Sequence, residues 1–165
     1  MAVNVYPKDL VGARYDETST TAVFPVGTKS IDSQGGSWVY VQAGEAIDQY
    51  AACKVDKDFQ LTQLTTAISG AEPTDVGIAQ VAFANDEYGF VFEGPGGGDN
   101  SGIKVLALTL CATDVKLYTT ATAGRIDDTA TDLIAGLMLC STNAAGGTVA
   151  TECYAVQKLV TNAQD

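Results

Sequence analysis

The chain contains no histidine, so it lacks the imidazole on which most triad-type hydrolases and many metal sites depend. Its four cysteines, Cys53, Cys111, Cys140 and Cys153, are isolated, and none belongs to a Cys-x-x-Cys pair, so no zinc site is expected. Each cysteine has Ala, Leu or Tyr beside it in strand-like sequence. We therefore predict buried, reduced thiols, with a disulfide as the alternative.

Several short acidic or glycine-containing stretches match functional motifs only in part. Asp32-Ser33-Gln34-Gly35 and Asp128-Thr129-Ala130 lack a correctly placed glycine for the Asp-Thr/Ser-Gly motif of aspartic proteases. Gly27-Thr28-Lys29-Ser30 lacks the Gly-Lys step and upstream glycine of a phosphate-binding loop. Asp56-Lys57-Asp58 and Asp127-Asp128 do not continue into a calcium loop. Asp and Ser are common turn residues, so the sequence predicts turns here, with no catalytic residue, no metal and no cofactor.

Short runs of apolar and β-branched residues, separated by turn residues, predict an all-β fold. At its centre we expect a hairpin over 76–92, followed by an exposed loop at Gly94–Gly98. The predicted strands cover residues 37–43, 51–55, 59–64, 76–83, 88–92, 103–111, 114–119, 133–140 and 152–160. The loop over 65–73 has room for one helical turn near Ala67. Such a pattern is typical of a small β-barrel or β-sandwich, and periodicity does not separate the two.

Residues 1–34 differ from the core predicted over 35–165. Their apolar side chains are spaced apart between polar stretches, and no helical period appears. We interpret them as an extended N-terminal arm that lies on another surface, with an ordinary first strand and loop as the alternative. Trp38 and Tyr40 are added to the expected interface because strand aromatics are often buried in a core or between subunits. The predicted interface with that surface or with another subunit comprises Val3, Val5, Tyr6, Leu10, Val23, Phe24, Val26, Trp38 and Tyr40.

The chain is strongly acidic, with 20 Asp and Glu residues against 9 Lys and Arg and a net charge of −11. An acidic surface repels phosphate backbones and anionic lipids, so neither a nucleic-acid nor a membrane partner is expected. The first residues lack the apolar stretch of a secretory signal, and no run is long enough to span a bilayer. We therefore expect synthesis in a reducing cytoplasm, with the acidity keeping an abundant protein soluble.

Five stretches carry a family resemblance, and Trp38 and Tyr88-Gly89-Phe90 are its sharpest parts. The stretches are Ser37–Gly44, Val76–Ala82, Glu87–Val91, Lys104–Ala107 and Leu117–Gly124. Together they resemble head decoration (cement) proteins of tailed bacteriophages. The resemblance implies a β-tulip-like virion protein without enzymatic activity. It implies binding to the major capsid protein on the outer surface of the head, where neighbouring capsid subunits are cemented against internal DNA pressure.

The resemblance also implies a homotrimer, and an Ala-rich core favours one because subunit contacts would complete a thin core. The alternative function is a host- or glycan-binding module of a phage fibre or adhesin, which would use exposed aromatics and loops such as 94–102. An enzyme is not expected, since the sequence positions no acid, base or nucleophile. A weak internal similarity links 59–62 and 76–79 with 115–119 and 133–136. It fits either two related strand–loop–strand units or chance composition.

Overall fold

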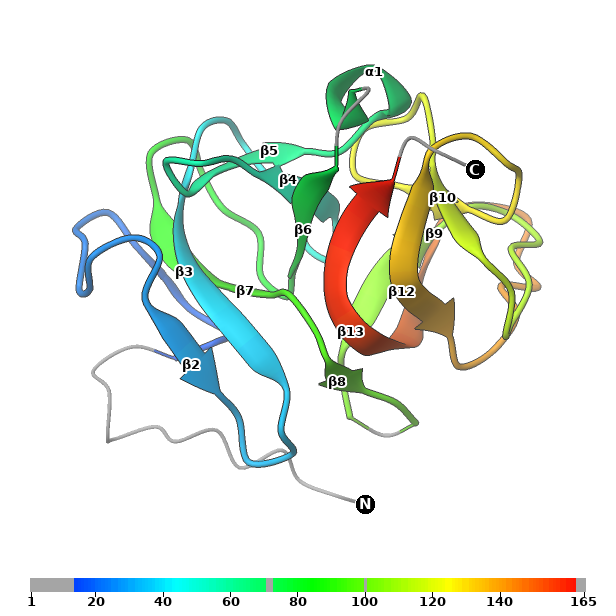
Figure 1. Ribbon diagram of the computed structural model, residues 1–165, viewed down its shortest axis with the longest axis horizontal. Coiled ribbons are helices and arrows are strands. Elements are labelled where there is room, and N and C mark those ends of the chain that lie inside the picture. The colour runs from blue at the N-terminus through cyan, green and yellow to red at the C-terminus, as the bar shows by residue number, and fades with distance from the viewer. Residues whose placement is uncertain (1–13, 71–72, 100, 163–165) are drawn as a thin grey trace.

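The computed structural model describes residues 14–70, 73–99 and 101–162, and its regular secondary structure is almost entirely strand (Figure 1). Strands make up 44% of the structure and helix makes up 3%, which confirms the predicted all-β fold. In the described part of the chain the one helix is α1 (Thr66–Ser69), a single turn at the place expected near Ala67. Thr65 caps this turn, because its hydroxyl accepts a hydrogen bond from the Ile68 N–H.

Five strands close into a first barrel, named barrel 1. They are β3 (Ser37–Ala43), β4 (Ala52–Val55), β5 (Gln60–Gln63), β6 (Thr74–Ala79) and β7 (Tyr88–Phe92). Their order is β7-β3-β5-β4-β6, and β6 pairs with β7 to complete the ring. The antiparallel β6–β7 pair is the hairpin predicted from the sequence. The alternative between barrel and sandwich is thus decided in favour of a barrel, because this ring leaves neither of its end strands unpaired.

A second ring of five strands, named barrel 2, repeats this arrangement. Its strands are β9 (Lys104–Ala107), β10 (Leu117–Thr119), β11 (Ile126–Asp127), β12 (Leu133–Leu139) and β13 (Val149–Asn162). They are ordered β13-β12-β10-β11-β9, and β13 pairs with β9 to close the ring. In each barrel the first and third strands are parallel and the other neighbours are antiparallel. The chain therefore contains the same five-strand topology twice.

The strand registers give residue-by-residue equivalences between the two barrels. The equivalent pairs fixed by register are Ala43 and Ala107, Leu61 and Ile126, Ala79 and Leu139, and Val91 and Cys153. The connecting loops are equivalent as well. In barrel 1 the Phe83 N–H donates to the Ile47 carbonyl, and in barrel 2 the Asn143 N–H donates to the Cys111 carbonyl. The internal similarity in the sequence correctly pairs the equivalent strands β6 and β12. It wrongly pairs β5 with β10, because the strand equivalent to β5 is β11.

Equivalent positions fill the interiors of both barrels, and all of them are buried. In barrel 1 they are Val39, Val41, Ala43, Ile47, Cys53, Val55, Leu61, Ala79, Phe83 and Val91. Their counterparts in barrel 2 are Ile103, Val105, Ala107, Cys111, Leu117, Thr119, Ile126, Leu139, Asn143 and Cys153. Each barrel is therefore closed around packed side chains, with two polar replacements in barrel 2.

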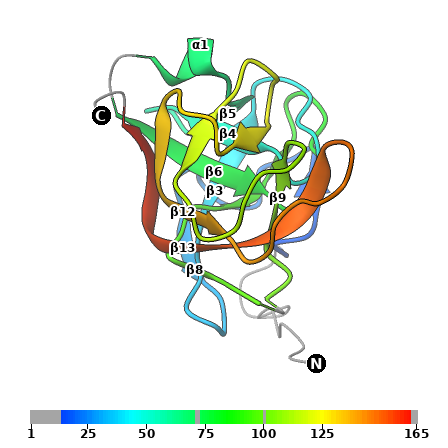
Figure 2. The same cartoon turned by 90° about the vertical axis from the view of Figure 1, so that its right-hand side faces the viewer.

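Strand β13 joins the two barrels and runs across both of them (Figures 1 and 2). Its first part pairs with β9, and β12 pairs with it both there and at its end. Its last residues, Val160 and Thr161, also pair with Asp75 and Thr74 of β6. Around this junction a single apolar cluster extends from Trp38 and Phe92 of barrel 1 to the interior of barrel 2. The predicted core region 35–165 thus holds two barrels packed against each other.

The exposed loop predicted at Gly94–Gly98 is not found, because Gly96–Gly97 form the short strand β8 against Tyr154 and Ala155 of β13. Gly94 is buried. A Cβ atom at Gly97 would lie 2.5 Å from the Cys153 carbonyl oxygen, and Gly97 has a φ of +85°. The glycines that predicted an exposed loop therefore permit close approach of two strands.

Residues 14–34 pack onto barrel 1 of their own chain. β1 (Thr18–Ser19) pairs with β7, and β2 (Lys29–Ile31) pairs with β3. Tyr15 is buried and stacks on Trp38, with ring centroids 4.4 Å apart. The described part of the predicted N-terminal arm thus packs on its own chain. This agrees with the alternative prediction of an ordinary first strand and loop.

Candidate functional site

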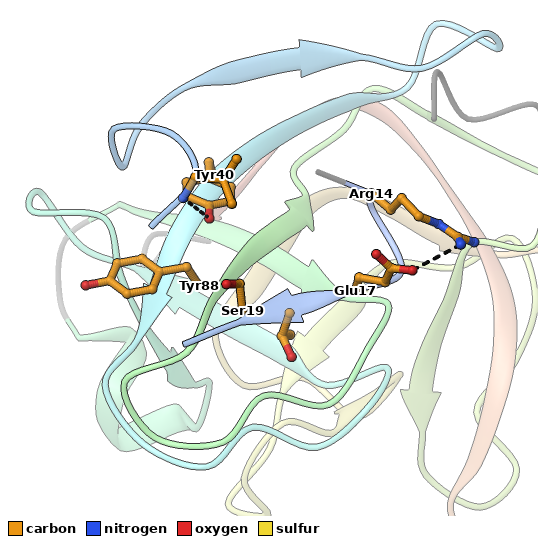
Figure 3. A pocket seen from close by; sticks show the side chains of 7 residues that line it. Arg14, Glu17, Ser19, Tyr40 and Tyr88 are labelled. Carbon is orange, nitrogen blue, oxygen red and sulfur yellow. Dashed lines mark hydrogen bonds and ion pairs between the residues drawn. The ribbon is translucent and has the colours of Figure 1, made fainter. Parts of the chain in front are cut away.

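A pocket of about 230 Å³ lies where the N-terminal segment crosses barrel 1 (Figure 3). Strand β1 forms one side through its pairing with β7, and the Tyr40 and Tyr88 side chains come from β3 and β7. These two rings are nearly parallel, with centroids 6.4 Å apart. The lining residues are Arg14, Glu17, Thr18, Ser19, Val23, Tyr40 and Tyr88.

The polar groups of this pocket are mostly engaged with one another. Arg14 makes ion pairs with Asp16 at 2.7 Å and with Glu17 at 3.0 Å, and the hydrogen bond to Asp16 is the main cause that raises the pKa of Arg14. The Val23 N–H donates to the Tyr40 hydroxyl at 3.1 Å. The Ser19 hydroxyl donates to the Thr21 carbonyl, and the chain has no histidine to activate it. The pocket therefore offers aromatic and hydroxyl contacts to a small polar group.

The predicted interface residues divide into those outside the described range, those in the described N-terminal segment, and the two strand aromatics Trp38 and Tyr40. Val3, Val5, Tyr6 and Leu10 lie outside the described residues. Val23 and Val26 are exposed, and Phe24 packs edge-on against Tyr40 at 5.5 Å. The exposed Ile31 of β2, which the sequence reading did not select, lies on the strand that flanks β3.

The interface role predicted for Trp38 and Tyr40 needs correction, because both side chains are buried within the chain. The Trp38 indole donates to the buried Asp32 carboxylate at 2.9 Å, and the Gly36 N–H donates to the same carboxylate at 2.8 Å. Tyr40 packs against Phe90 at 5.0 Å. Strand aromatics predict burial, but the partner that buries them is set by the fold.

Asp127 and Asp128, which the sequence analysis compared with a calcium loop, form a cluster with Cys111, which the sequence did not connect with them. One ligand atom from each residue lies within 4.8 Å of the others. β11 ends at Asp127, and Cys111 sits in the loop after the neighbouring β9. Burial, followed by the charges of Asp128 and Asp127, raises the Cys111 pKa to about 12, so the thiol is neutral at ordinary pH. Asp128 has a structural task as well, since its carboxylate accepts from the Ala112 N–H at 2.9 Å.

All four cysteines are free, as predicted. Cys53, Cys111 and Cys153 are buried, and Cys140 is half-buried. Burial is the largest cause that raises the pKa of each thiol, to about 11 for Cys140. A reactive thiolate requires a lowered pKa, which comes from exposure and nearby positive charge.

The comparisons with known proteins return no match: neither a family model, nor a curated protein, nor a solved structure matches this chain. Among the described residues, no helix is long and apolar enough to cross a membrane.

Proposed function

We propose that this chain is a structural decoration protein of a tailed-phage head. It binds the major capsid protein on the outer surface and links neighbouring capsid subunits. The observation that supports this most is where the resembling stretches lie. Ser37–Gly44, Val76–Ala82 and Glu87–Val91 belong mainly to strands of barrel 1, whereas Lys104–Ala107 and Leu117–Gly124 belong to barrel 2 and its loops. The likeness therefore extends over the framework of both barrels.

The interiors and the charge of the chain fit this role. Both barrel interiors are filled with side chains, so the described fold is suited to presenting surfaces rather than to holding a cofactor. A net charge of −11 suits an outer face and not a lumen lined with DNA. Many copies on one shell turn a modest affinity per site into strong total binding.

The test is the copy number of this protein in purified virions, together with binding of the purified chain to heads stripped of decoration. We expect hundreds of copies per virion, and heads that resist heat or chelator better once the protein is added back. Absence from virions, or addition without any protection of the heads, would refute the proposal.

A glycan-binding module remains the second candidate, and the pocket beside Tyr88 is the observation that favours it. The half-buried Tyr88 ring, the Tyr40 hydroxyl and Arg14 surround a space of about 230 Å³. Apolar ring faces beside hydroxyl and guanidinium donors suit a sugar ring. A carbohydrate array separates the candidates: specific hits that Tyr88→Ala removes support this role, whereas a decoration protein gives none.

A further inference from the structure

Three side chains that can bind a metal ion meet at one end of barrel 2. They are the Cys111 thiol and the carboxylates of Asp127 and Asp128, and one ligand atom from each lies within 4.8 Å of the other two. A tetrahedral zinc ion holds its ligand atoms at about 2.0–2.3 Å, so atoms that share one ion lie somewhat closer together than this. Small side-chain movements therefore bring all three to a common ion.

The fold fixes these side chains on two neighbouring segments. β9 and β11 are parallel, with Ala107 opposite Ile126, so the residues that follow both strands meet at the same end of the barrel. The Leu108 N–H donates to the Ile126 carbonyl at 2.9 Å and joins the two segments. The Cys111 N–H donates to the Leu108 carbonyl, and the Cys111 carbonyl accepts from the Asn143 N–H. The backbone that carries the thiol is thus held on both sides.

The Cys111 thiol is buried without an acceptor for its proton. The residue is 0% exposed, and its sulfur donates none of the described hydrogen bonds, whereas the buried Cys53 sulfur donates to the Ala51 carbonyl. Burial and the two carboxylates raise the pKa of Cys111, and a hydrogen bond from the Asp128 backbone acts in the opposite direction. A buried polar group normally has a partner, and this one faces two carboxylates. A cation between them satisfies all three groups.

The two carboxylates also lack a basic partner. Neither Asp127 nor Asp128 belongs to any ion pair among the described residues, and the nearby Arg125 pairs with Asp48 of barrel 1 instead. Asp128 uses Oδ2 to accept from the Ala112 N–H. Two neighbouring negative charges beside a buried thiol are unfavourable without a counter-charge. A bound cation supplies that charge.

Barrel 1 shows that this place in the fold does not require such residues. The equivalences place Ile47 at the position of Cys111, and Thr62 and Gln63 at those of Asp127 and Asp128. Barrel 1 therefore closes here with an apolar side chain, a hydroxyl and a neutral amide, none of which is a usual zinc ligand. Closure of a barrel alone does not explain why barrel 2 carries a thiol and two carboxylates.

We propose that Cys111, Asp127 and Asp128 bind one zinc ion at this end of barrel 2. A thiolate favours zinc over Mg²⁺ and Ca²⁺, which prefer oxygen ligands. On binding, a zinc–sulfur bond replaces the S–H bond of Cys111, and the proton passes to solvent. Three protein ligands leave the fourth tetrahedral position to water. The ion ties the loop after β9 to the end of β11.

This site lies outside the pattern that the sequence analysis searched for. A Cys-x-x-Cys pair places two ligands close together in the chain, whereas these ligands come from two segments that only the parallel β9–β11 pairing brings together. The inference does not rest on binding to a phage head. The metal test below and the virion test can therefore have different outcomes.

The experiment uses the full, reduced chain without an affinity tag. The chain has no histidine, so no imidazole of its own competes for the metal. Cd²⁺ and Co²⁺ serve as spectroscopic probes, because their bonds to a thiolate give charge-transfer bands in the ultraviolet. Calorimetry with Zn²⁺ gives the stoichiometry and the dissociation constant. Thermal melting with and without Zn²⁺ measures how far the ion stabilises the folded chain.

Two variants remove ligands from the site. Cys111→Ser removes the thiol. Asp127→Asn removes one charge and keeps the shape of a half-buried side chain that makes none of the described hydrogen bonds. Asp127→Asn is therefore expected to fold, and it tests the site even where Cys111→Ser does not fold. Circular dichroism verifies the fold of each variant.

Two further variants are matched controls. Cys140→Ser controls for the thiol, because Cys140 also lies beside carboxylates, those of Asp99 and Glu152. Asp86→Asn controls for charge, because Asp86 precedes Glu87 in barrel 1 and forms another pair of neighbouring carboxylates. Both controls leave the three proposed ligands in place.

We expect one zinc ion per chain, a thiolate–metal band and a higher melting temperature with zinc. Cys111→Ser should abolish the band. Asp127→Asn should raise the dissociation constant for Zn²⁺ at least about tenfold, since even the loss of a partner outside the ligand shell costs about 10–100-fold. Both controls should bind like wild type.

The inference is overturned if excess metal gives no thiolate–metal band with wild type, or if Cys111→Ser or Asp127→Asn binds Zn²⁺ like wild type. A band lost in Cys140→Ser instead would place the metal elsewhere and also overturn it. Equal weakening by Asp86→Asn and Asp127→Asn would show a general effect of acidic charge, with the same consequence.

Discussion

Tyr15 stacks on Trp38 with ring centroids 4.4 Å apart and an interplanar angle of 13°, and its hydroxyl lies 2.5 Å from that of Ser30. Phe90 contacts Tyr15 edge-on at 5.2 Å. A residue near the start of the described chain thereby completes the aromatic layer outside barrel 1. The N-terminal segment from Arg14 onward is consequently part of the folded unit.

Replacing Tyr15 with Ala should lower the free energy of unfolding by about 3–5 kcal/mol, because it leaves a cavity against Trp38 and Phe90. Urea denaturation followed by tryptophan fluorescence measures this. Arg14→Ala is the control, since its ion pairs are partly exposed and surface ion pairs contribute little to the free energy of unfolding. A loss no larger for Tyr15→Ala than for Arg14→Ala would show that the stacking is dispensable.

Two truncations should differ in their effect on folding. Deleting residues 1–13 leaves every described contact intact, so a cooperative thermal transition is expected. Deleting residues 1–30 also removes Tyr15, Phe24 and β1, and should expose the aromatic layer and cause loss of cooperativity or aggregation. Differential scanning calorimetry compares the two proteins. A cooperative transition at the same temperature in both would contradict the packing of this segment.

Asn143→Ala should destabilise barrel 2 by about 2–4 kcal/mol, because three carbonyls lose their donor inside a buried site. The control is Asn85→Ala, an exposed residue whose side chain contacts only Asp86 in the described hydrogen bonds, with an expected change below about 0.5 kcal/mol. Chemical denaturation provides both values. Equal effects for the two variants would mean that the Asn143 network does not hold the loops.

The thiols should react slowly in the folded protein and completely after unfolding without reductant. Burial raises the pKa of Cys140 to about 11 and that of Cys111 to about 12, so little thiolate exists at neutral pH. Titration with an aromatic disulfide reagent should find the half-buried Cys140 first and all four cysteines in denaturant. Fewer than four in denaturant would reveal a disulfide.

The same pKa shifts predict how stability depends on alkaline pH. An unfolded thiol ionises near pH about 8.5, whereas these thiols stay neutral in the folded state to higher pH. Their contribution to stability is therefore complete below that pH and is lost as the pH rises toward the folded values of about 11 and 12. Denaturation midpoints at rising pH test this for wild type against Cys140→Ser. An equal loss in both would assign the effect to other groups.

The sequence alone determined the all-β fold class and most strand positions, and it predicted reduced thiols and the place of a helical turn. These properties depend on local alternation, turn residues and the burial preference of cysteine, so they can be read over a few neighbouring residues. The turn at Asp32–Gly36 belongs with them, because Asp32 accepts from the N–H groups of Gln34 and Gly36 close by in the chain.

Only the tertiary structure decided which surfaces bury the aromatic and apolar side chains of the predicted interface, and how the strands are joined. Trp38 and Tyr40 read equally well as core or interface residues, and Tyr15 and Phe24 from the N-terminal segment resolved this by packing on the same layer. The sequence did not reveal the two barrels for a related reason. Their equivalence is carried by pairing between distant strands, whereas their interior residues differ in kind, as Phe83 and Asn143 do. Long-range pairing follows from the closure of each ring, which no local pattern in the sequence encodes.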